Sequence, residues 1–463
     1  MKATDVILGE PHPRRDAVGD IYKTRDATAL RLYGAMVFHR SNLYTFHRMP
    51  TYCAFLGHNP SVSLAELIAA VPGFSLTGRP APDVALFSTT EKLSPGLFST
   101  LGGTFAIAEG VDKPDLSLSD GPQVLLELAK KIRGKITFGL RTVGIPPSTI
   151  KENYRRYKDT LKRAGRPVRY IGNERKPAAA VLLHDAGIIS GKHGIELVIV
   201  ALPEERIWMG HTIAIQDVDA YTKRDIGKPV RDTTVGLLPP KLAQVMLNLG
   251  LWLLQSSRPQ LDKSQIINRK SQLTVLDPFC GTGVIPLECL VRGWNVFASD
   301  LSLKATNGTQ KNIDWIRKEM KILKKDAEST VWKQDACNPF ALKKLPDLIV
   351  TETSLGPALT RPPSEAPAER LRKQMEKLEV DFLKNAAATL PGVPIVCCWP
   401  FWRLHGGEMI RLTGLWEKLP SLGYRAVMPA IPKSKESTDF SLLYRRGEQF
   451  VGREIVMLQP VKK

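Results

Sequence analysis

Three acidic residues in the second half of the sequence each stand at the end of a predicted apolar strand. They are Asp277, Asp300 and Asp335, and the strands are 274–276, 295–298 and 330–333. The carboxyl ends of parallel strands meet at one edge of a sheet, so we expect these acids to line one cleft. An acid at position 300 suits a ribose diol, and one at position 335 suits an adenine amine. The pattern therefore predicts a nucleoside-binding cleft.

The sequence of the turn after the first of these strands distinguishes between two classes of nucleoside cofactor. It reads Asp277-Pro278-Phe279-Cys-Gly281-Thr-Gly283, and its glycines let the backbone approach a ligand closely. A dinucleotide site would normally carry GxGxxG, with the phosphates at a helix N-terminus. Here an acid precedes the glycines, which suits a cationic amino group better than a pyrophosphate. We therefore predict S-adenosylmethionine as the cofactor, in a pocket formed by Asp277, Pro278, Phe279, Gly281, Gly283, Asp300 and Asp335.

A fourth predicted strand, 348–351, leads into Glu352-Thr353-Ser354-Leu355. An acid at the end of a strand that faces the cofactor can accept hydrogen bonds from an exocyclic amine. This contact would direct the nitrogen lone pair toward a methyl donor. The alternative interpretation is a surface acid in an ordinary loop. The functional interpretation makes Glu352 a candidate catalytic residue.

Strands alternate with helices in the region that carries these acids, which is typical of a parallel sheet covered on both faces. The 463 residues have a hydrophobic fraction of 43%, which is enough for roughly three folded domains. The pattern from Tyr52 onward is strand, helix, two strands, helix 123–132 and strand 135–140, the order of a ferredoxin-like fold. Further strands are expected at 168–171, 178–183 and 195–202. Residues 1–50 show no clear period and are interpreted as a loosely ordered extension.

The net charge of +19 favours a polyanionic partner, and the excess is concentrated in one segment. Residues 151–176 carry ten Lys or Arg against three acids, on a predicted helix at 149–164 and the turn after it. A solvated helix face is the alternative, but the single sign and the interleaved tyrosines favour a nucleic-acid surface. The candidate RNA-binding residues are Arg155, Arg156, Lys158, Lys162, Arg163, Arg166 and Arg169.

The cysteines and histidines indicate neither a metal nor a disulfide scaffold. The six Cys contain no paired CxxC motif, and the eight His lack metal-ligand spacing. We therefore predict no metal site and free thiols in a reducing compartment, here taken as the cytoplasm. No apolar stretch reaches the roughly 18 residues of a membrane span, so no membrane partner is expected.

Two sets of motifs carry a resemblance to a known family. The turn DPFCGTG, followed by acid-ended strands and the acid-led loop after the fourth strand, looks like the amino-methyltransferases, which read (D/N)PPY in that loop. The stretch from Arg224 through Gly236-Leu-Leu-Pro239-Pro240-Lys241-Leu-Ala resembles the THUMP-domain tRNA (guanine-N2)-methyltransferases. So does the segment from Phe55 to Leu67. The resemblance adds Thr353 and Leu355 to Glu352 as candidate catalytic residues. The sequence departs from the family at these positions, because Thr353 and Ser354 replace the prolines and Leu355 replaces the aromatic residue.

The resemblance implies a fold class and a domain order. It implies an α/β chain with a C-terminal Rossmann-like class I methyltransferase domain, preceded by a ferredoxin-like α+β domain and a THUMP α/β domain. The implied order is an extension (1–50), a ferredoxin-like domain (51–143), a THUMP-like RNA-binding domain (144–215), a linker (216–235) and a methyltransferase domain (236–463). It also places Pro240 among the cofactor-binding residues.

The function implied is transfer of a methyl group to the exocyclic N2 of guanosine in structured RNA, most of all tRNA. Two alternatives stay open. One is an RNA-binding protein that keeps the methyltransferase fold with weak or lost activity, because the loop lacks its prolines and aromatic residue. The other is an amino-methyltransferase for another nucleic acid. The sequence leaves the nucleotide position and any protein partner undefined.

Overall fold

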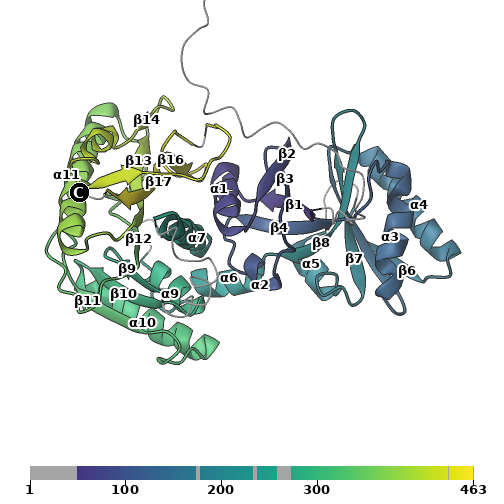
Figure 1. Cartoon of the computed structure of the whole chain (residues 1–463), viewed down its shortest axis with the longest axis horizontal. Coiled ribbons are helices and arrows are strands. Elements are labelled where there is room, and N and C mark those ends of the chain that lie inside the picture. Colours follow the sequence, from purple (N-terminus) through teal and green to yellow (C-terminus); the bar gives the residue numbers. More distant parts are fainter. Residues whose placement is uncertain (1–48, 174–177, 233–236, 258–272, 436, 462–463) are drawn as a thin grey trace, which may run out of the picture. The chain divides into compact units, whose positions relative to one another are not determined.

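Two β-sheets organise the protein, one in each half of the sequence (Figure 1). The structure is a computed structural model, and it describes residues 49–173, 178–232, 237–257, 273–435 and 437–461. Almost all of the predicted extension over 1–50 lies outside these described residues. The elements named below are those of the described residues.

The first sheet has eight strands in the order β2-β3-β1-β4-β8-β7-β5-β6. Its strands are β1 (Thr51–Leu56), β2 (Ser75–Ala81), β3 (Val84–Ser88), β4 (Thr104–Gly110), β5 (Ile136–Val143), β6 (Val168–Ile171), β7 (Gly194–Ala201) and β8 (Ile207–Ile215). Its helices are α1 (Pro60–Ala70), α2 (Pro95–Phe98), α3 (Gly121–Leu128), α4 (Pro147–Arg163) and α5 (Ala180–Asp185). The predicted basic helix over 149–164 is therefore confirmed as α4.

The strand order β2-β3-β1-β4 is that of a ferredoxin-like arrangement, but its members differ from the predicted ones. The sequence pattern missed β2, whose residues alternate between half-buried and exposed and which contains Gly78 and Pro80. The second helix of this unit is the four-residue α2. The predicted helix over 123–132 and the strand over 135–140 belong to the other half of the sheet, because β5 pairs in parallel with both β6 and β7. No break in the sheet separates residues 51–143 from 144–215.

One further element prediction in this half was wrong, and the predicted linker contains a helix. The apolar run 178–183, expected as a strand, contributes to helix α5, which buries Leu183 and leaves Val181 and Leu182 exposed. The stretch 216–235, expected as a linker, contains helix α6 (Val218–Asp225). The side chain of Asp217 caps α6 by accepting a hydrogen bond from the backbone nitrogen of Ala220 (2.9 Å). The polar composition of this stretch therefore reflects a capped surface helix.

The second sheet follows the order β11-β10-β9-β12-β13-β17-β15, and the strands of the predicted parallel core are confirmed. They are β9 (Thr274–Asp277), β10 (Asn295–Asp300), β11 (Ser329–Lys333), β12 (Leu348–Glu352) and β13 (Ile395–Arg403). The strand β17 (Val451–Pro460) runs antiparallel to β13, and β14 (Met409–Ile410), β15 (Tyr424–Ala426) and β16 (Ser441–Tyr444) complete the sheet. Parallel pairing from β11 to β13 brings the carboxyl ends of these strands to one edge.

Helices cover both faces of the second sheet. Helices α7 (Pro240–Ser257), α9 (Val284–Val291) and α10 (Leu303–Met320) share one apolar core with the sheet, and α11 (Glu365–Thr389) belongs to a second core. Leu247 and Ile285 are fully buried in the first core, and Phe382 and Trp399 in the second. This packing holds the strand ends in fixed positions, because densely packed cores resist deformation.

A buried polar cluster connects α1 with the second sheet's helices. Glu66 of α1 accepts hydrogen bonds from the backbone nitrogens of Gly102 (2.8 Å) and Gly103 (2.7 Å) and from the side chain of Asn248 on α7 (2.6 Å). The guanidinium of Arg292, at the end of α9, donates in turn to Asn248 (2.7 Å). Residues Val62 and Ala65 of α1 also pack into the core that contains α7. The two halves of the described chain thus share both apolar and polar contacts.

Candidate active site

A cavity of about 1130 Å³ lies at the carboxyl edge of the parallel strands. Its lining brings together Asp277 of β9, Asp300 of β10, Asp335 after β11 and Glu352 of β12. Pro278, Phe279, Gly281, Thr353 and Leu355 also line it. Asp277 and Glu352 are 75 positions apart in the sequence, yet both line this cleft, as the alternation of strands and helices predicted.

The two glycines of the β9–α9 turn have different surroundings. Gly281 has a φ of +52°, and a Cβ added there would meet no atom within 4 Å, so it would project into open space beside the cavity. Gly283 has a φ of +86°, and a Cβ there would lie 2.9 Å from the side chain of Thr309 on α10. Gly281 thus leaves room for a ligand, whereas Gly283 lets α9 begin against α10 and does not line the cavity.

The acids of β10 and β11 are held by backbone groups. The two carboxylate oxygens of Asp300 accept hydrogen bonds from the nitrogens of Gly281 (3.0 Å) and Ser302 (2.8 Å). One oxygen of Asp335 accepts from the nitrogen of Cys337 (2.9 Å). These contacts fix the direction of both carboxylates toward the cavity without using up all of their lone pairs. Both side chains can therefore still accept hydrogen bonds from a ligand.

Asp277 is the most deeply buried acid of the cleft, at 2% exposed. Its carboxylate accepts hydrogen bonds from the hydroxyl of Thr351 (2.7 Å) and the nitrogen of Phe279 (3.3 Å). Burial raises the pKa of Asp277 to about 8, although both hydrogen bonds oppose this rise. At pH 7 the carboxyl is therefore mostly protonated, and a cation placed beside it would favour its ionisation.

Glu352 forms an ion pair that the sequence did not predict. The Nε of Arg453, on β17, donates to Oε1 of Glu352, and Nη2 of Arg453 donates to the carbonyl of Leu237 (3.3 Å). The arginine is 1% exposed, and the glutamate side chain is 15% exposed on the cavity side. Burial raises the pKa of Glu352, and the charge of Arg453 opposes that rise.

The remaining predicted residues of this site have mixed positions. The hydroxyl of Thr353 donates to the carbonyl of Cys398 (2.8 Å), so it anchors the loop to β13 while the residue lines the cavity. Leu355 is half-buried in the lining. Pro240 is buried at the start of α7 and is absent from the lining.

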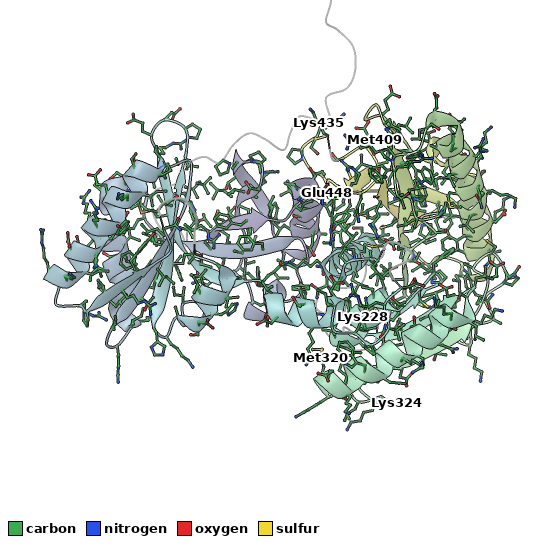
Figure 2. All side chains as sticks on the ribbon, turned by 180° about the vertical axis from the view of Figure 1, so that it is seen from behind. Lys228, Met320, Lys324, Met409, Lys435 and Glu448 are labelled. Atoms are coloured by element: carbon green, nitrogen blue, oxygen red, sulfur yellow. The ribbon has the colours of Figure 1, made fainter. Side chains whose placement is uncertain are left out.

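Sequence reasoning missed the contribution of β17 and of the turn before it. Glu448, Gln449, Phe450 and Arg453 line the cavity, and Glu448 is labelled in Figure 2. No sequence signal could have placed Arg453 beside Glu352, because the pair depends on how two strands on either side of β13 pack. The turn 446–449 is nevertheless well defined, since the Nη1 of Arg445 donates to the carbonyls of Gly447 (2.7 Å) and Gln449 (3.0 Å).

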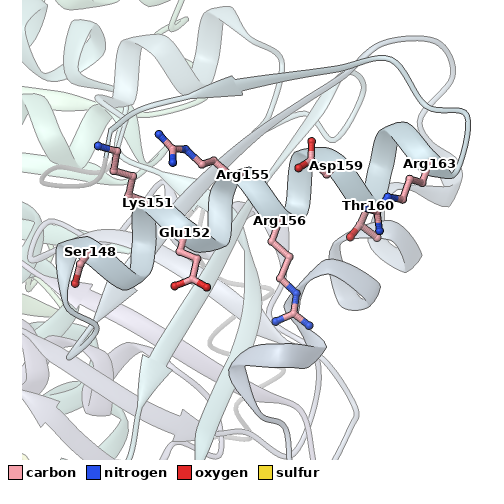
Figure 3. A pocket seen from close by; sticks show the side chains of 8 residues that line it. All are labelled: Ser148, Lys151, Glu152, Arg155, Arg156, Asp159, Thr160 and Arg163. Atoms are coloured by element: carbon pink, nitrogen blue, oxygen red, sulfur yellow. The ribbon is translucent and has the colours of Figure 1, made fainter.

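The candidate RNA-binding residues lie on and after α4. The helix buries Ile150, Tyr157 and Leu161 and exposes its cations on the other side. A surface hollow along it is lined by Ser148, Lys151, Glu152, Arg155, Arg156, Asp159, Thr160 and Arg163 (Figure 3). Figure 3 shows Lys151 and Arg155 on one side of the helix and Glu152 and Arg156 on the other.

Not all of the candidate cations on this surface are equally available. Arg155, Arg156, Lys162, Arg163 and Arg169 are exposed, and Lys158 is half-buried. Arg166 instead donates to the carbonyls of Ala129 (3.5 Å) and Ile132, which gives its guanidinium a structural contact at the end of the preceding helical turn. The available positive charge is therefore concentrated on α4 itself.

Two other kinds of site are not found in the described part of the chain. Among its residues, no group of three or more His, Cys, Asp or Glu is arranged to hold a metal ion. No helix in the same part is both long enough and apolar enough to cross a bilayer.

The strand order, with antiparallel β17 beside five parallel strands and acids at the strand ends, defines a Rossmann-like α/β fold. Residues 261–342 match the family model described as Conserved hypothetical protein 95. A tRNA (guanine(10)-N2)-dimethyltransferase from Methanothermobacter thermautotrophicus is 26% identical over 163 residues, which are 35% of this chain and 38% of that relative. The match confirms the resemblance to the tRNA (guanine-N2)-methyltransferases, and it spans less than half of the relative.

Two solved structures align with the chain at TM-scores below 0.5. TrmN from Thermus thermophilus aligns with a TM-score of 0.44 and 16% identity, over 89% of this chain and 100% of that chain. Magnesium protoporphyrin IX methyltransferase from Synechocystis, with bound S-adenosylhomocysteine, aligns with a TM-score of 0.29 and 13% identity, over 52% of this chain and 96% of that chain.

Proposed function

We propose that this protein is an S-adenosylmethionine-dependent methyltransferase that acts on the exocyclic N2 of guanosine in tRNA. One observation carries the proposal: a single cavity collects a nucleoside-type set of acids and a further acid at the reactive edge. Similarity to a tRNA (guanine(10)-N2)-dimethyltransferase supports the choice of acceptor. A cytoplasmic location is part of the proposal, because all six cysteines are free thiols, as expected in a reducing compartment.

The residues of the cleft fit the proposed cofactor. Asp300 and Asp335 offer carboxylate oxygens to a ribose diol and an adenine amine, and Gly281 leaves open space where a side chain would stand. The buried Asp277 suits a cationic amino group, since ionisation of its carboxyl would be favoured by that charge. When bound, S-adenosylmethionine supplies an electrophilic methyl group.

The role of Glu352 is alignment of the acceptor. Its carboxylate, held by Arg453 and open to the cavity, can accept an N–H of the amine and direct the nitrogen lone pair toward the methyl carbon. The bound cofactor would supply the methyl group, and the Glu352 carboxylate would be placed to accept the proton that the nitrogen loses on alkylation. Little proton abstraction is needed beforehand, because the amine becomes strongly acidic only once it is alkylated.

The proposed RNA partner fits the exposed cations of α4. Phosphate contacts position an RNA and supply affinity, whereas the chemistry takes place at another sheet edge. We include in the proposal that residues of the first sheet form a THUMP-like RNA-binding module. The family resemblance and the local excess of Lys and Arg support this assignment.

The direct test is transfer of labelled methyl groups from S-adenosylmethionine into total tRNA, followed by nuclease digestion and mass spectrometry of the nucleosides. We expect N2-methylguanosine from the parental protein and at least about 10²-fold less from Glu352→Gln. The control is binding of S-adenosylhomocysteine by calorimetry, which should be the same for both proteins. A different methylated nucleoside would contradict the proposed acceptor atom.

A second function is favoured by the loop after β12. Thr353 and Ser354 stand where the related enzymes have prolines, and Leu355 offers no aromatic face for stacking on a flipped base, a contact that is worth about 1–3 kcal/mol per base in stacking platforms. A protein that binds RNA through the same fold without turnover would show tight tRNA and cofactor binding but no methyl incorporation. That result would replace the proposed activity with an RNA-binding function.

A further inference from the structure

We propose that Arg453 is the positioning residue of the acceptor site, and that its pairing with Glu352 selects a neutral aromatic amine over an aliphatic ammonium. This inference rests on the proposed methyl transfer and gives a physical reason why the site takes a nucleobase amine. It concerns a residue from β17, on the far side of β13 from β12.

The contacts of the Arg453 guanidinium hold the side chain of Glu352 in one orientation. The guanidinium is held on two sides, by Oε1 of Glu352 and by the carbonyl of Leu237 at 3.3 Å. It is 1% exposed, so water does not compete for these contacts. Since only Oε1 of Glu352 is paired with the arginine, the second carboxylate oxygen is left for a ligand. A rotamer change of Glu352 would break the ion pair, so the pair stabilises the orientation in which the second carboxylate oxygen is left for a ligand.

The charge balance around the pair sets the substrate class. Glu352 and Arg453 form an ion pair whose two charges sum to zero, with the arginine side chain 2% exposed and the glutamate side chain 15% exposed. Three other ionisable side chains face the pair from packed elements, namely Asp277 on β9, Cys398 on β13 and Tyr444 on β16, and Glu448 lines the cavity beside them. Burial raises the pKa of both Asp277 and Cys398, so these two are mostly uncharged at pH 7.

An aliphatic amine and a nucleobase amine respond differently to this balance. A lysine amine has an ordinary pKa near 10.4 and is cationic at pH 7, so it needs an unpaired carboxylate for binding and deprotonation. The exocyclic amine of a base is neutral and needs only an aligned acceptor. A paired, immobile glutamate supplies that acceptor without a net negative charge. The site therefore favours the amine of a nucleobase.

The test compares two arginines of neighbouring ion pairs. In Arg453→Met we expect kcat for tRNA methylation to fall by about 10–100-fold, as is usual when a supporting contact of a reactive group is lost. The KM for tRNA should stay within about twofold of the parental value, since the phosphate contacts are elsewhere. The acid limb of the kcat profile should move to higher pH, because the pKa of Glu352 rises further without the arginine. Arg453→Lys keeps the charge and should recover part of the loss.

The matched control is Arg411→Met. Arg411 pairs with Glu454, which is fully buried and adjacent to Arg453 in sequence, so this variant also leaves a buried glutamate unpaired. Arg411 does not line the cavity. We expect a similar loss of thermal stability in both variants, but a shifted pH profile only in Arg453→Met. Equal losses of kcat with unmoved acid limbs would reduce Arg453 to a structural role and overturn the proposal.

Two further measurements separate this inference from the proposed function. If the parental protein methylates no RNA, the proposed function fails, and a ¹³C-carboxyl NMR titration still tests the pair. The Glu352 signal, assigned by its loss in Glu352→Gln, should titrate at higher pH in Arg453→Met than in the parental protein. An unchanged titration overturns the role of Arg453. Methylation of a lysine-rich peptide as efficient as that of tRNA would overturn the substrate class.

Discussion

Neutralising exposed cations of α4 should weaken RNA binding by an amount that depends on salt. Arg155, Arg156 and Lys162 are exposed on this helix, while its apolar side is buried in the first sheet's core. Each phosphate contact contributes about 0.7–0.9 to the slope of log K against log salt, so Arg155→Gln, Arg156→Gln and Lys162→Gln together should reduce the slope by about 2–3. At 0.1 M salt this corresponds to a loss of about two to three powers of ten in affinity.

The assay is tRNA binding by fluorescence anisotropy from 50 to 300 mM salt. A matched control carries Lys318→Gln, Lys321→Gln and Lys324→Gln, which remove the same charge from the exposed end of α10 and the residues after it (Lys324 is labelled in Figure 2). The control should keep nearly the parental slope, and neither variant should change S-adenosylhomocysteine binding. Equal losses in the two variants would refute α4 as the RNA surface and would indicate that only net charge matters.

Three further outcomes follow from the cleft. Because burial raises the pKa of Asp277 to about 8, binding of a cationic cofactor should release a proton from its carboxyl group. Below pH 8 the affinity should therefore rise with pH, by up to about tenfold per pH unit. Calorimetry in buffers of different ionisation enthalpy measures the proton release, which Asp277→Asn should abolish. Gly283→Ala should lower the free energy of unfolding by about 1–3 kcal/mol in thermal melts, since a Cβ at φ +86° meets Thr309. Gly281→Ala also strains the backbone, at φ +52°, but its Cβ meets no atom, so it should lower stability less than Gly283→Ala and weaken cofactor binding more. Equal effects of the two alanines on stability and on binding would contradict the different roles assigned to these glycines.

The parallel sheet and three of its acids could be predicted because their signals are local. An apolar strand, an acid at its end and a glycine turn are adjacent in sequence, and the rule that parallel strands end at one edge brings Asp277, Asp300 and Asp335 together. The same rule placed Glu352 in the cavity. Gly283 was assigned to the cofactor because motif and packing glycines look alike in sequence. Only its contact with Thr309 shows its structural role.

The remaining features depend on contacts between segments far apart in sequence. The ion pair of Glu352 and Arg453 arises from packing on either side of β13, and no local pattern signals it. Helix α5 was predicted as a strand, because a short apolar run fits both and only burial of Leu183 with exposure of Val181 separates them. The grouping of β5 was wrong because strand pairing, and not sequence order, decides which half of the sheet a strand joins.

The close approach of Gly102 to α7 limits how this architecture can be rearranged. A Cβ at Gly102 would lie 1.9 Å from the carbonyl oxygen of Lys241, and Glu66 has its hydrogen-bond donors in both halves of the chain. A chimera that joined residues 51–216 to another Rossmann-like domain would bury Glu66 without Asn248 and would place a different helix surface against Gly102. Recombination is therefore expected to succeed only when α1, the turn before β4 and α7 are inherited together. The segment between the two sheets is therefore not a suitable point for exchanging domains, because α7 lies after it and contacts α1 and Gly102 before it.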